Sequence, residues 1–305
     1  MILVAGSANI DLVARVDHQP APGETLIAES YAVHDGGKGA NQAVAAARMG
    51  SRVRFVGAVG ADDFGARIRT ALEAEQIDTS ALAIRGAASG IAMISVDAPG
   101  ENCIIVVPGA NGELGVIEDA ATVFDGARVV LTQLETPPAF VNAALMAGRL
   151  HGAETMLNAA PAASLSPYAL DALDWLIVNA AEAALIGEAA VPADVTTARA
   201  LAGDLAATHS VSVVITLGAD GAIWQTRDAT VEDAAGHVAS GVAQVVDTTG
   251  AGDTFAGVFA WARSQDKPIR EAVTWAVAAG GLSVGQAGAR SGMPCFTQLA
   301  EAVGD

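Results

Sequence analysis

Residues 247–255 read Asp-Thr-Thr-Gly-Ala-Gly-Asp-Thr-Phe and lead into a helical segment that extends to residue 263. Glycines at a strand-to-helix junction leave backbone N–H groups bare above the first helical turn. Those donors and the helix dipole favour an anion at that position. The stretch therefore predicts an anion site where an α/β fold usually binds its ligands.

Asp253 closes this stretch, and a carboxylate cannot itself hold an anion because like charges repel. Two interpretations suit it. It is either a general base beside the anion, which takes a proton from an attacking hydroxyl, or an ordinary carboxylate of a first helical turn. The short motif alone leaves both open.

Short β-branched runs alternate with Ala/Leu-rich segments of helical period along most of the chain. Strands are expected at residues 2–5, 53–59, 128–131, 155–157, 175–178 and 211–217. Helices are expected at residues 40–49, 65–75, 137–150, 180–186, 196–208, 269–284 and 296–303. Pro137 suits a first helical turn and Gly50 a position just after a helix. Neither period is clean over residues 159–173. The alternation predicts an α/β fold with a mostly parallel sheet flanked by helices.

Two segments, residues 12–34 and 90–107, are strand-like but have no helix to cover them. We expect them to form a small separate sheet inserted into a single α/β domain that spans residues 1–305. The exposed face of such a sheet needs cover from a partner subunit or a bound ligand.

The composition excludes several classes of protein. The 305 residues include 34 Asp and Glu against 16 Lys and Arg, a net charge of −18, which argues against nucleic-acid or anionic-membrane partners. The 52% of apolar residues allows a large core. The sequence has no apolar run of transmembrane length and no signal-peptide pattern, and Cys103 and Cys295 lack disulfide or zinc spacing. We therefore expect a cytoplasmic protein.

Common nucleotide motifs are absent from the sequence. Lys38 and Lys267, its two lysines, are followed by Gly39 and Pro268, so no P-loop is present. The first strand is followed by Gly-Ser-Ala-Asn-Ile-Asp at residues 6–11 instead of a dinucleotide-binding G-x-G-x-x-G.

Polar or glycine-rich residues nevertheless follow several expected strands. Asn9 and Asp11 come after the first strand and suit either hydrogen bonds to a polyol or a plain turn. The run Gly-Gly-Lys-Gly-Ala-Asn at residues 36–41 opens a helix with a scarce lysine. Glu135 could accept a hydroxyl hydrogen bond or merely cap the next helix. Asn179, Glu182 and residues 216–221 follow two further strands.

Together these motifs resemble the ribokinase-like family of carbohydrate and nucleoside kinases. The resemblance rests on residues 6–11, 36–43, 133–135, 158–162, 216–218 and 247–253, in the family's order, and extends from Val4 to about Pro294. It implies that the small sheet is a lid over the sugar and is commonly shared between the subunits of a homodimer.

The resemblance also implies an activity. Asp253 would be the base that activates the 5-hydroxyl of D-ribose, and Gly250, Ala251 and Gly252 would form an anion hole for the phosphoryl group. ATP would be the donor and D-ribose 5-phosphate the product. The positions that match sugar contacts are Asn9, Asp11, Gly37, Lys38, Gly39, Asn41, Glu135 and Asp253.

Nucleotide and metal positions follow from the same resemblance. The positions that match ATP contacts are Asn179, Thr216, Leu217, Gly218, Ala219, Asp220, Gly221, Gly252 and Val277. Glu182 would help to handle Mg²⁺ indirectly. A potassium activator would lie near Asp247, Thr249, Ser283, Gln286 and Gly288. The family's usual hydroxyl side chain in that site aligns with Gly292, and Ser291 precedes it.

Two other hypotheses stay open. One is a kinase for another sugar or nucleoside of the family, such as deoxyribose or a pseudouridine-like nucleoside. The other is a non-catalytic sugar-binding relative, which is disfavoured because the chain keeps Asp253 and the glycines before it.

Overall fold

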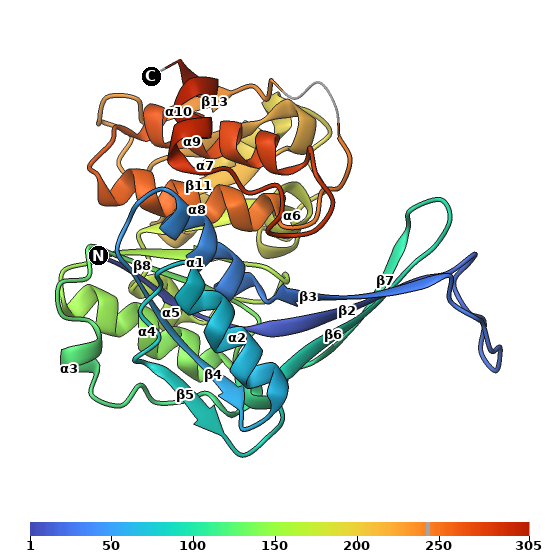
Figure 1. Cartoon of the computed structure of the whole chain (residues 1–305). Coiled ribbons are helices and arrows are strands. Elements are labelled where there is room, and N and C mark those ends of the chain that lie inside the picture. The colour runs from blue at the N-terminus through green and yellow to red at the C-terminus, as the bar shows by residue number, and fades with distance from the viewer. Residues whose placement is uncertain (242–244, 305) are drawn as a thin grey trace.

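A nine-stranded sheet forms the centre of the computed structural model, which describes residues 1–241 and 245–304 (Figure 1). The strands, in their order across the sheet, are β13 (Ala235–Val238), β12 (Ala222–Gln225), β11 (Ser212–Thr216), β10 (Trp175–Asn179), β9 (Glu154–Asn158), β8 (Val129–Gln133), β1 (Ile2–Ala5), β4 (Val53–Gly60) and β5 (Leu82–Arg85). Neighbours from β5 to β11 pair in parallel, while β12 and β13 run antiparallel. The predicted, mostly parallel sheet is confirmed.

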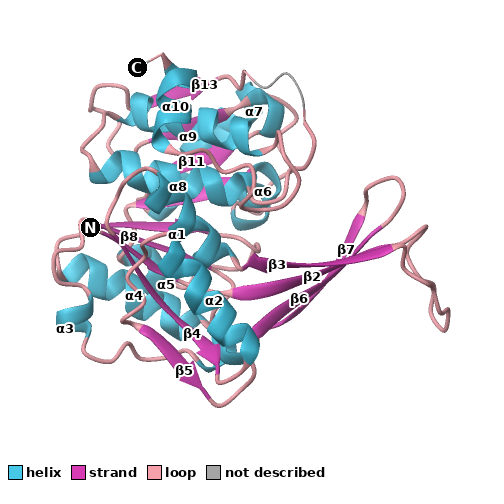
Figure 2. Ribbon diagram, in the orientation of Figure 1, coloured by secondary structure: helices cyan, strands magenta, loops and turns pink. Residues whose placement is uncertain are grey.

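Helices cover both faces of this sheet (Figure 2). One face carries α1 (Lys38–Arg48), α2 (Asp63–Ala74), α8 (Ala251–Ser264), α9 (Ile269–Ser283) and α10 (Phe296–Val303). The other face carries α4 (Pro138–Leu150), α5 (Pro167–Asp171), α6 (Ala180–Ile186) and α7 (Val195–His209). Strand β1 shows why both faces are apolar. Ile2 and Val4 lie in the first core and Leu3 and Ala5 in the opposite one, as side chains alternate along a strand.

Short elements account for most differences from the sequence-based prediction. Strands β5, β12 and β13 and helices α3 (Ala120–Val123) and α5 have four or five residues each, which is too short for a clear period. Helix α1 begins at Lys38 instead of residue 40, directly after Gly37. Pro137 precedes α4, and Pro138 occupies its first turn instead. Gly50 follows α1 with a φ of 81°, as predicted for a residue just after a helix.

A second sheet projects from one side of the body (Figure 1). Its order is β3 (Ser30–Gly36), β2 (Asn9–Arg15), β6 (Gly90–Val96) and β7 (Asn102–Val107). Because β2 begins at Asn9, with only three residues between it and the end of β1, the alternative of a plain turn at Asn9 and Asp11 is wrong. The backbone there pairs with β3 and β6 instead.

The second sheet is little covered within one chain. All six residues of β7 are exposed. Among the described residues, no helix has the length and apolar character required to cross a bilayer.

Candidate active site

Asp253 lies in the first turn of α8 and is only 7% exposed. Its carboxylate is held by two amides from the start of α1. Asn41 donates from Nδ2 to Oδ2 at 3.0 Å, and Gln42 donates from Nε2 to Oδ1 at 3.0 Å. The carboxylate is therefore engaged by a neighbouring helix, unlike a side chain that caps its own helix.

The side-chain amides of Asn41 and Gln42 are each held by hydrogen bonds to further side chains. Arg290 donates from Nε to Oδ1 of Asn41 at 2.8 Å. Gln133 donates from Nε2 to Oε1 of Gln42 at 2.6 Å, and Gln42 also donates to Oδ1 of Asn158 at 3.0 Å. Buried polar groups that are paired in this way restrict one another's orientation.

Burial and the neighbouring groups have opposite effects on the pKa of Asp253. Burial raises the pKa of Asp253, while the nearby ammonium of Lys38 and the amides of Asn41 and Gln42 counteract this rise. Burial alone would lower the pKa of Lys38, but the surrounding carboxylates, that of Asp253 first, raise it. A carboxylate with a raised pKa beside a retained positive charge is a common setting for proton transfer next to an anion.

Glu135 joins the start of α1 to the end of β8. Its Oε2 accepts hydrogen bonds from Oγ of Ser7 at 2.6 Å and from the backbone N–H of Lys38 at 3.0 Å. The alternative that Glu135 caps α4 is therefore wrong, since its carboxylate points to a different helix. The same bonds fix the N-terminus of α1 against the chain between β1 and β2.

Asp11 and Asn9 reach this region from β2. Burial and the carboxylates of Glu135 and Asp253 raise the pKa of Asp11 to about 6. Asn9 is 3% exposed, and its Oδ1 accepts a hydrogen bond from Nδ2 of Asn111 at 2.8 Å. The second sheet thus brings two polar side chains to the edge where the parallel strands end.

Close approach explains the glycines before α1. Gly37 has a φ of 87°, and a Cβ there would lie 2.7 Å from the backbone N of Asn9. A Cβ on Gly39 would lie 2.7 Å from the backbone N of Ser7. Any larger residue would push α1 away from the start of β2.

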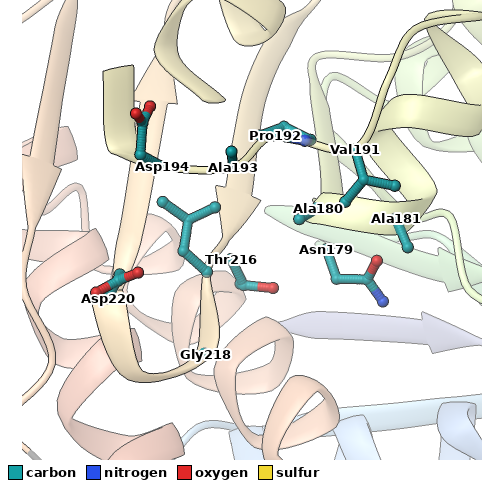
Figure 3. A pocket seen from close by; sticks show the side chains of 11 residues that line it. Asn179, Ala180, Ala181, Val191, Pro192, Ala193, Asp194, Thr216, Gly218 and Asp220 are labelled. Carbon is teal, nitrogen blue, oxygen red and sulfur yellow. The ribbon is translucent and has the colours of Figure 1, made fainter. Parts of the chain in front are cut away.

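Most candidate nucleotide positions line two adjoining cavities. The first, of about 380 Å³, lies between Asn179, at the end of β10, Thr216, at the end of β11, and residues 191–194 (Figure 3). The second, of about 250 Å³, is lined by Gly252, Phe255 and Val277. Thr216 and Gly218 line both cavities, so the two cavities adjoin there, and Ala251 and Gly252 of the first turn of α8 line the second one.

Asn179 and Glu182 bond to each other at the start of α6. The side chain of each accepts the backbone N–H of the other at 2.8 Å, which is a capping box. Burial raises the pKa of Glu182, although the N–H of Asn179 and the charge of Lys38 counteract the rise. These two hydrogen bonds explain why Asn179 and Glu182 are three residues apart, since that is the spacing of a capping box.

Several of the candidate potassium positions contact one another just before α8 or after α9. The carboxylate of Asp247 accepts the N–H groups of Thr249 at 2.9 Å and Gly288 at 2.8 Å. A Cβ on Gly292 would overlap the carbonyl oxygen of Ser283, so that position has no room for a side chain. Gln286 is exposed.

Several residues that contribute to this region had no assigned role in the sequence analysis, among them Gln42, Asn111 and Arg290. Gln42 lay inside a quoted motif, so its polarity within an Ala-rich helix was an available signal. Asn111 and Arg290 are far from the motifs they support, and no local pattern marks them. Asn111 holds Asn9 from a 3₁₀ turn, and Arg290 holds Asn41 from a loop after α9.

Known proteins resemble this chain over nearly all its length. Ribokinase from Haemophilus influenzae is 36% identical over 98% of this chain and 97% of its own. A deoxyribokinase from Salmonella typhi is 35% identical over 98% and 97%. The structure of Arabidopsis thaliana ribokinase complexed with ribose and ATP has a TM-score of 0.90 and 29% identity, and covers 99% of this chain and 98% of that one.

The model of the pfkB family carbohydrate kinases matches residues 1–295. That match covers every element that builds the site. The chain is therefore an ATP-dependent sugar kinase that belongs to the pfkB family of carbohydrate kinases.

Proposed function

We propose that this enzyme transfers the γ-phosphoryl group of ATP to the 5-hydroxyl of D-ribose and releases D-ribose 5-phosphate. The observation that carries the proposal is the setting of Asp253, a buried carboxylate in the first turn of a helix with Lys38 close by. Asn41 and Gln42 of α1 contact its carboxylate, and its neighbours Ala251, Gly252 and Phe255 line the second cavity.

Asp253 acts as the general base in this proposal. Its carboxylate is oriented by Asn41 and Gln42, and it takes the proton from the sugar hydroxyl as that oxygen attacks phosphorus. Asp11, Asn9 and the start of α1 hold the remaining hydroxyls. Positioning matters more than covalent chemistry in phosphoryl transfer.

Residues 250–252 form the anion hole. Gly250 has a φ of 77°, and a Cβ there would lie 2.5 Å from the carbonyl oxygen of Ala289. Among the described residues, no atom lies within 4 Å of where a Cβ of Gly252 would be. The first turn of this 14-residue helix thus has open space at Gly252, where the helix dipole favours the transferring phosphate. Within the loop, the N–H of Ala251 donates to the carbonyl oxygen of Thr248 at 3.2 Å.

Mg²⁺ would be carried mainly by the nucleotide. The residues that the structure describes contain no group of three or more His, Cys, Asp or Glu fit to hold a metal. This suits Mg²⁺, which is commonly bound by one or two carboxylates together with substrate phosphates. When bound, the ion neutralises phosphate charge, and Glu182 would contribute indirectly.

Potassium would be held by Asp247 and backbone carbonyls beside the anion hole. Position 292 could contribute only its backbone, because a side chain does not fit there. Ser291 is then the candidate hydroxyl, and its Oγ lies 3.4 Å from where a Cβ of Gly288 would be. The ion would steady the loop that leads into Gly250.

A second substrate is favoured by one observation, the deoxyribokinase that is 35% identical over nearly the whole chain. Ribose and deoxyribose differ only by one hydroxyl. A site built to hydrogen-bond that hydroxyl discriminates strongly, because its partner is otherwise left unpaired.

A phosphorylation assay over a panel of sugars and nucleosides tests the proposal, with ATP and Mg²⁺ and with KCl replaced by choline chloride at constant ionic strength. We expect the highest kcat/KM with D-ribose and a rise in activity with KCl. A preference for deoxyribose or a nucleoside would overturn the substrate, and a flat KCl response would overturn the potassium site alone.

A further inference from the structure

We propose that Arg290 is a positioning residue for the phosphoryl transfer, which acts by fixing the side-chain amide of Asn41 toward Asp253. The inference deepens the proposed function, since it rests on Asp253 being the base. Arg290 lies in the loop after α9, 249 residues from Asn41, and touches neither Asp253 nor the two cavities directly.

The chemistry of the three groups allows only one orientation of the amide. An arginine Nε can only donate, and an ionised carboxylate can only accept. Asn41 lies between them, with Oδ1 at 2.8 Å from Nε of Arg290 and Nδ2 at 3.0 Å from Oδ2 of Asp253. A flipped amide would face a donor with a donor and an acceptor with an acceptor, so Arg290 selects the productive form.

The amide that donates to the other oxygen of Asp253, Oδ1, is held by a weaker hydrogen bond. Gln42 donates to Oδ1, and its own Oε1 accepts from the neutral amide of Gln133. The only charged group behind either amide is therefore Arg290, among the contacts of the described residues. A charged donor makes the stronger hydrogen bond, so the Asn41 side of the carboxylate is the better fixed one.

Arg290 is also anchored independently of Asn41. One of its terminal nitrogens, Nη2, donates to the carbonyl oxygen of Gly36 at 3.2 Å. Its backbone carbonyl accepts a hydrogen bond from Nη1 of Arg48 at 2.7 Å. The loop is thus held by Arg48, while the Nε of Arg290 is left to act on Asn41.

Loss of the Nε donor should change proton uptake as well as rate. Lys38, Glu135, Asp11 and Glu182 are the charged groups that face Asp253. One of them, Asp11, also depends on the charge of Arg290, which lowers its pKa, and Arg290 itself faces Asp35, Glu75 and Arg48 as well. Arg290→Lys keeps that charge, so it separates an effect on Asp11 from an effect through Asn41. An amide that rotates away stops stabilising the ionised carboxylate, so the pKa of Asp253 rises. Because the base must be ionised, kcat would then begin to fall at a higher pH as the solution is made more acidic.

Three substitutions separate the donor from the charge. Arg290→Met keeps an unbranched apolar side chain but has no donor, and Arg290→Gln places an amide nitrogen at the position of Nε. Arg290→Lys keeps the charge but carries its donors one atom further along the side chain than Nε. We expect Arg290→Met to lower kcat about tenfold, the size of one net hydrogen bond, with an unchanged KM for ATP. The acidic limb of its profile of kcat against pH should shift to a higher pH. Arg290→Gln should restore both, and Arg290→Lys neither.

Arg48→Met is the matched control, because it loosens the same loop without touching Asn41. It should lower the melting temperature and leave the acidic limb in place. Equal pH shifts in both variants, or no shift in Arg290→Met, would overturn the proposal. Failure of Arg290→Gln to recover activity would overturn it as well.

If Arg290→Met does not fold, the comparison of Arg290→Gln with Arg290→Lys still tests whether a donor at the position of Nε is required. Asp253→Asn separates this inference from the function beneath it. An active Asp253→Asn enzyme would refute the base, whereas an inactive one beside a normal Arg290→Met enzyme would refute only the role of Arg290.

Discussion

At the scale of single residues, Asp253 is the sharpest test of the chemistry. Asp253→Asn keeps the shape of the side chain but cannot accept the hydroxyl proton, and it keeps only one of the two acceptor oxygens that Asn41 and Gln42 contact. We expect a folded variant with a somewhat lower melting temperature and a fall in kcat of about 10²- to 10⁴-fold, the usual contribution of a general base. Glu271→Gln, in the first turn of α9, is the matched control and should retain activity. A variant with more than a tenth of normal turnover would remove Asp253 from the mechanism.

Asp11 gives a prediction about sugar affinity and pH. Its pKa of about 6 means that it accepts hydroxyl hydrogen bonds above that pH and loses this ability as the pH falls through 6. We expect D-ribose binding, measured by calorimetry without nucleotide, to weaken from pH 7 to pH 5. Asp11→Asn should bind about 10- to 100-fold more weakly, the range of a hydrogen bond to a charged group.

The same titration of Asp11→Asn should show little of this pH dependence. Asp17→Asn, shortly after β2, is the control, because its side chain is 87% exposed and its carboxylate pairs with His18 at 3.2 Å. If the pH dependence survives in Asp11→Asn, another group controls sugar binding.

At the scale of elements, the glycine turn before α1 can be tested against a turn of similar conformation. Gly37 and Gly50 both have positive φ, 87° and 81°. A Cβ on Gly37 would strike the backbone of β2, whereas among the described residues nothing lies within 4 Å of one on Gly50. Gly50→Ala should cost about 1 kcal/mol of unfolding free energy, and Gly37→Ala clearly more, with loss of activity. Chemical denaturation measures both, and equal losses would contradict the close approach.

The elements also show what the sequence could and could not reveal. Strands such as β10 and helices such as α6 carry strong local patterns and were predicted within a residue. The start of β2 was missed because Asn9 and Asp11 favour turns, and tertiary pairing with β3 and β6 outweighs that preference. Likewise, the contact of Arg290 with Asn41 depends on packing between distant segments, which no local pattern encodes.

At the scale of the whole molecule, the second sheet predicts a homodimer. Its face turned away from the cavity beside Asp11 carries Tyr31, Met93 and Ile105, which are 64%, 41% and 62% exposed. Large exposed apolar groups on a projecting sheet favour association. Ile105→Asp should shift the mass in solution, measured by light scattering, from dimer to monomer. Leu150→Asp, 82% exposed at the end of α4, should stay dimeric. A wild-type monomer would refute the dimer.

The contacts around Asp253 join segments that are far apart in the sequence, and this has a consequence for biosynthesis. Asn41 and Asp253 are 212 residues apart, and Arg290 lies later still. A nascent chain of 250 residues already contains α1, with Asn41 and Gln42, but neither Asp253 nor Arg290. Such long-range contacts form late and slowly during folding. Catalysis is therefore acquired only after residue 290 has been synthesised, so turnover reports that the segments from α1 to the loop after α9 have folded together.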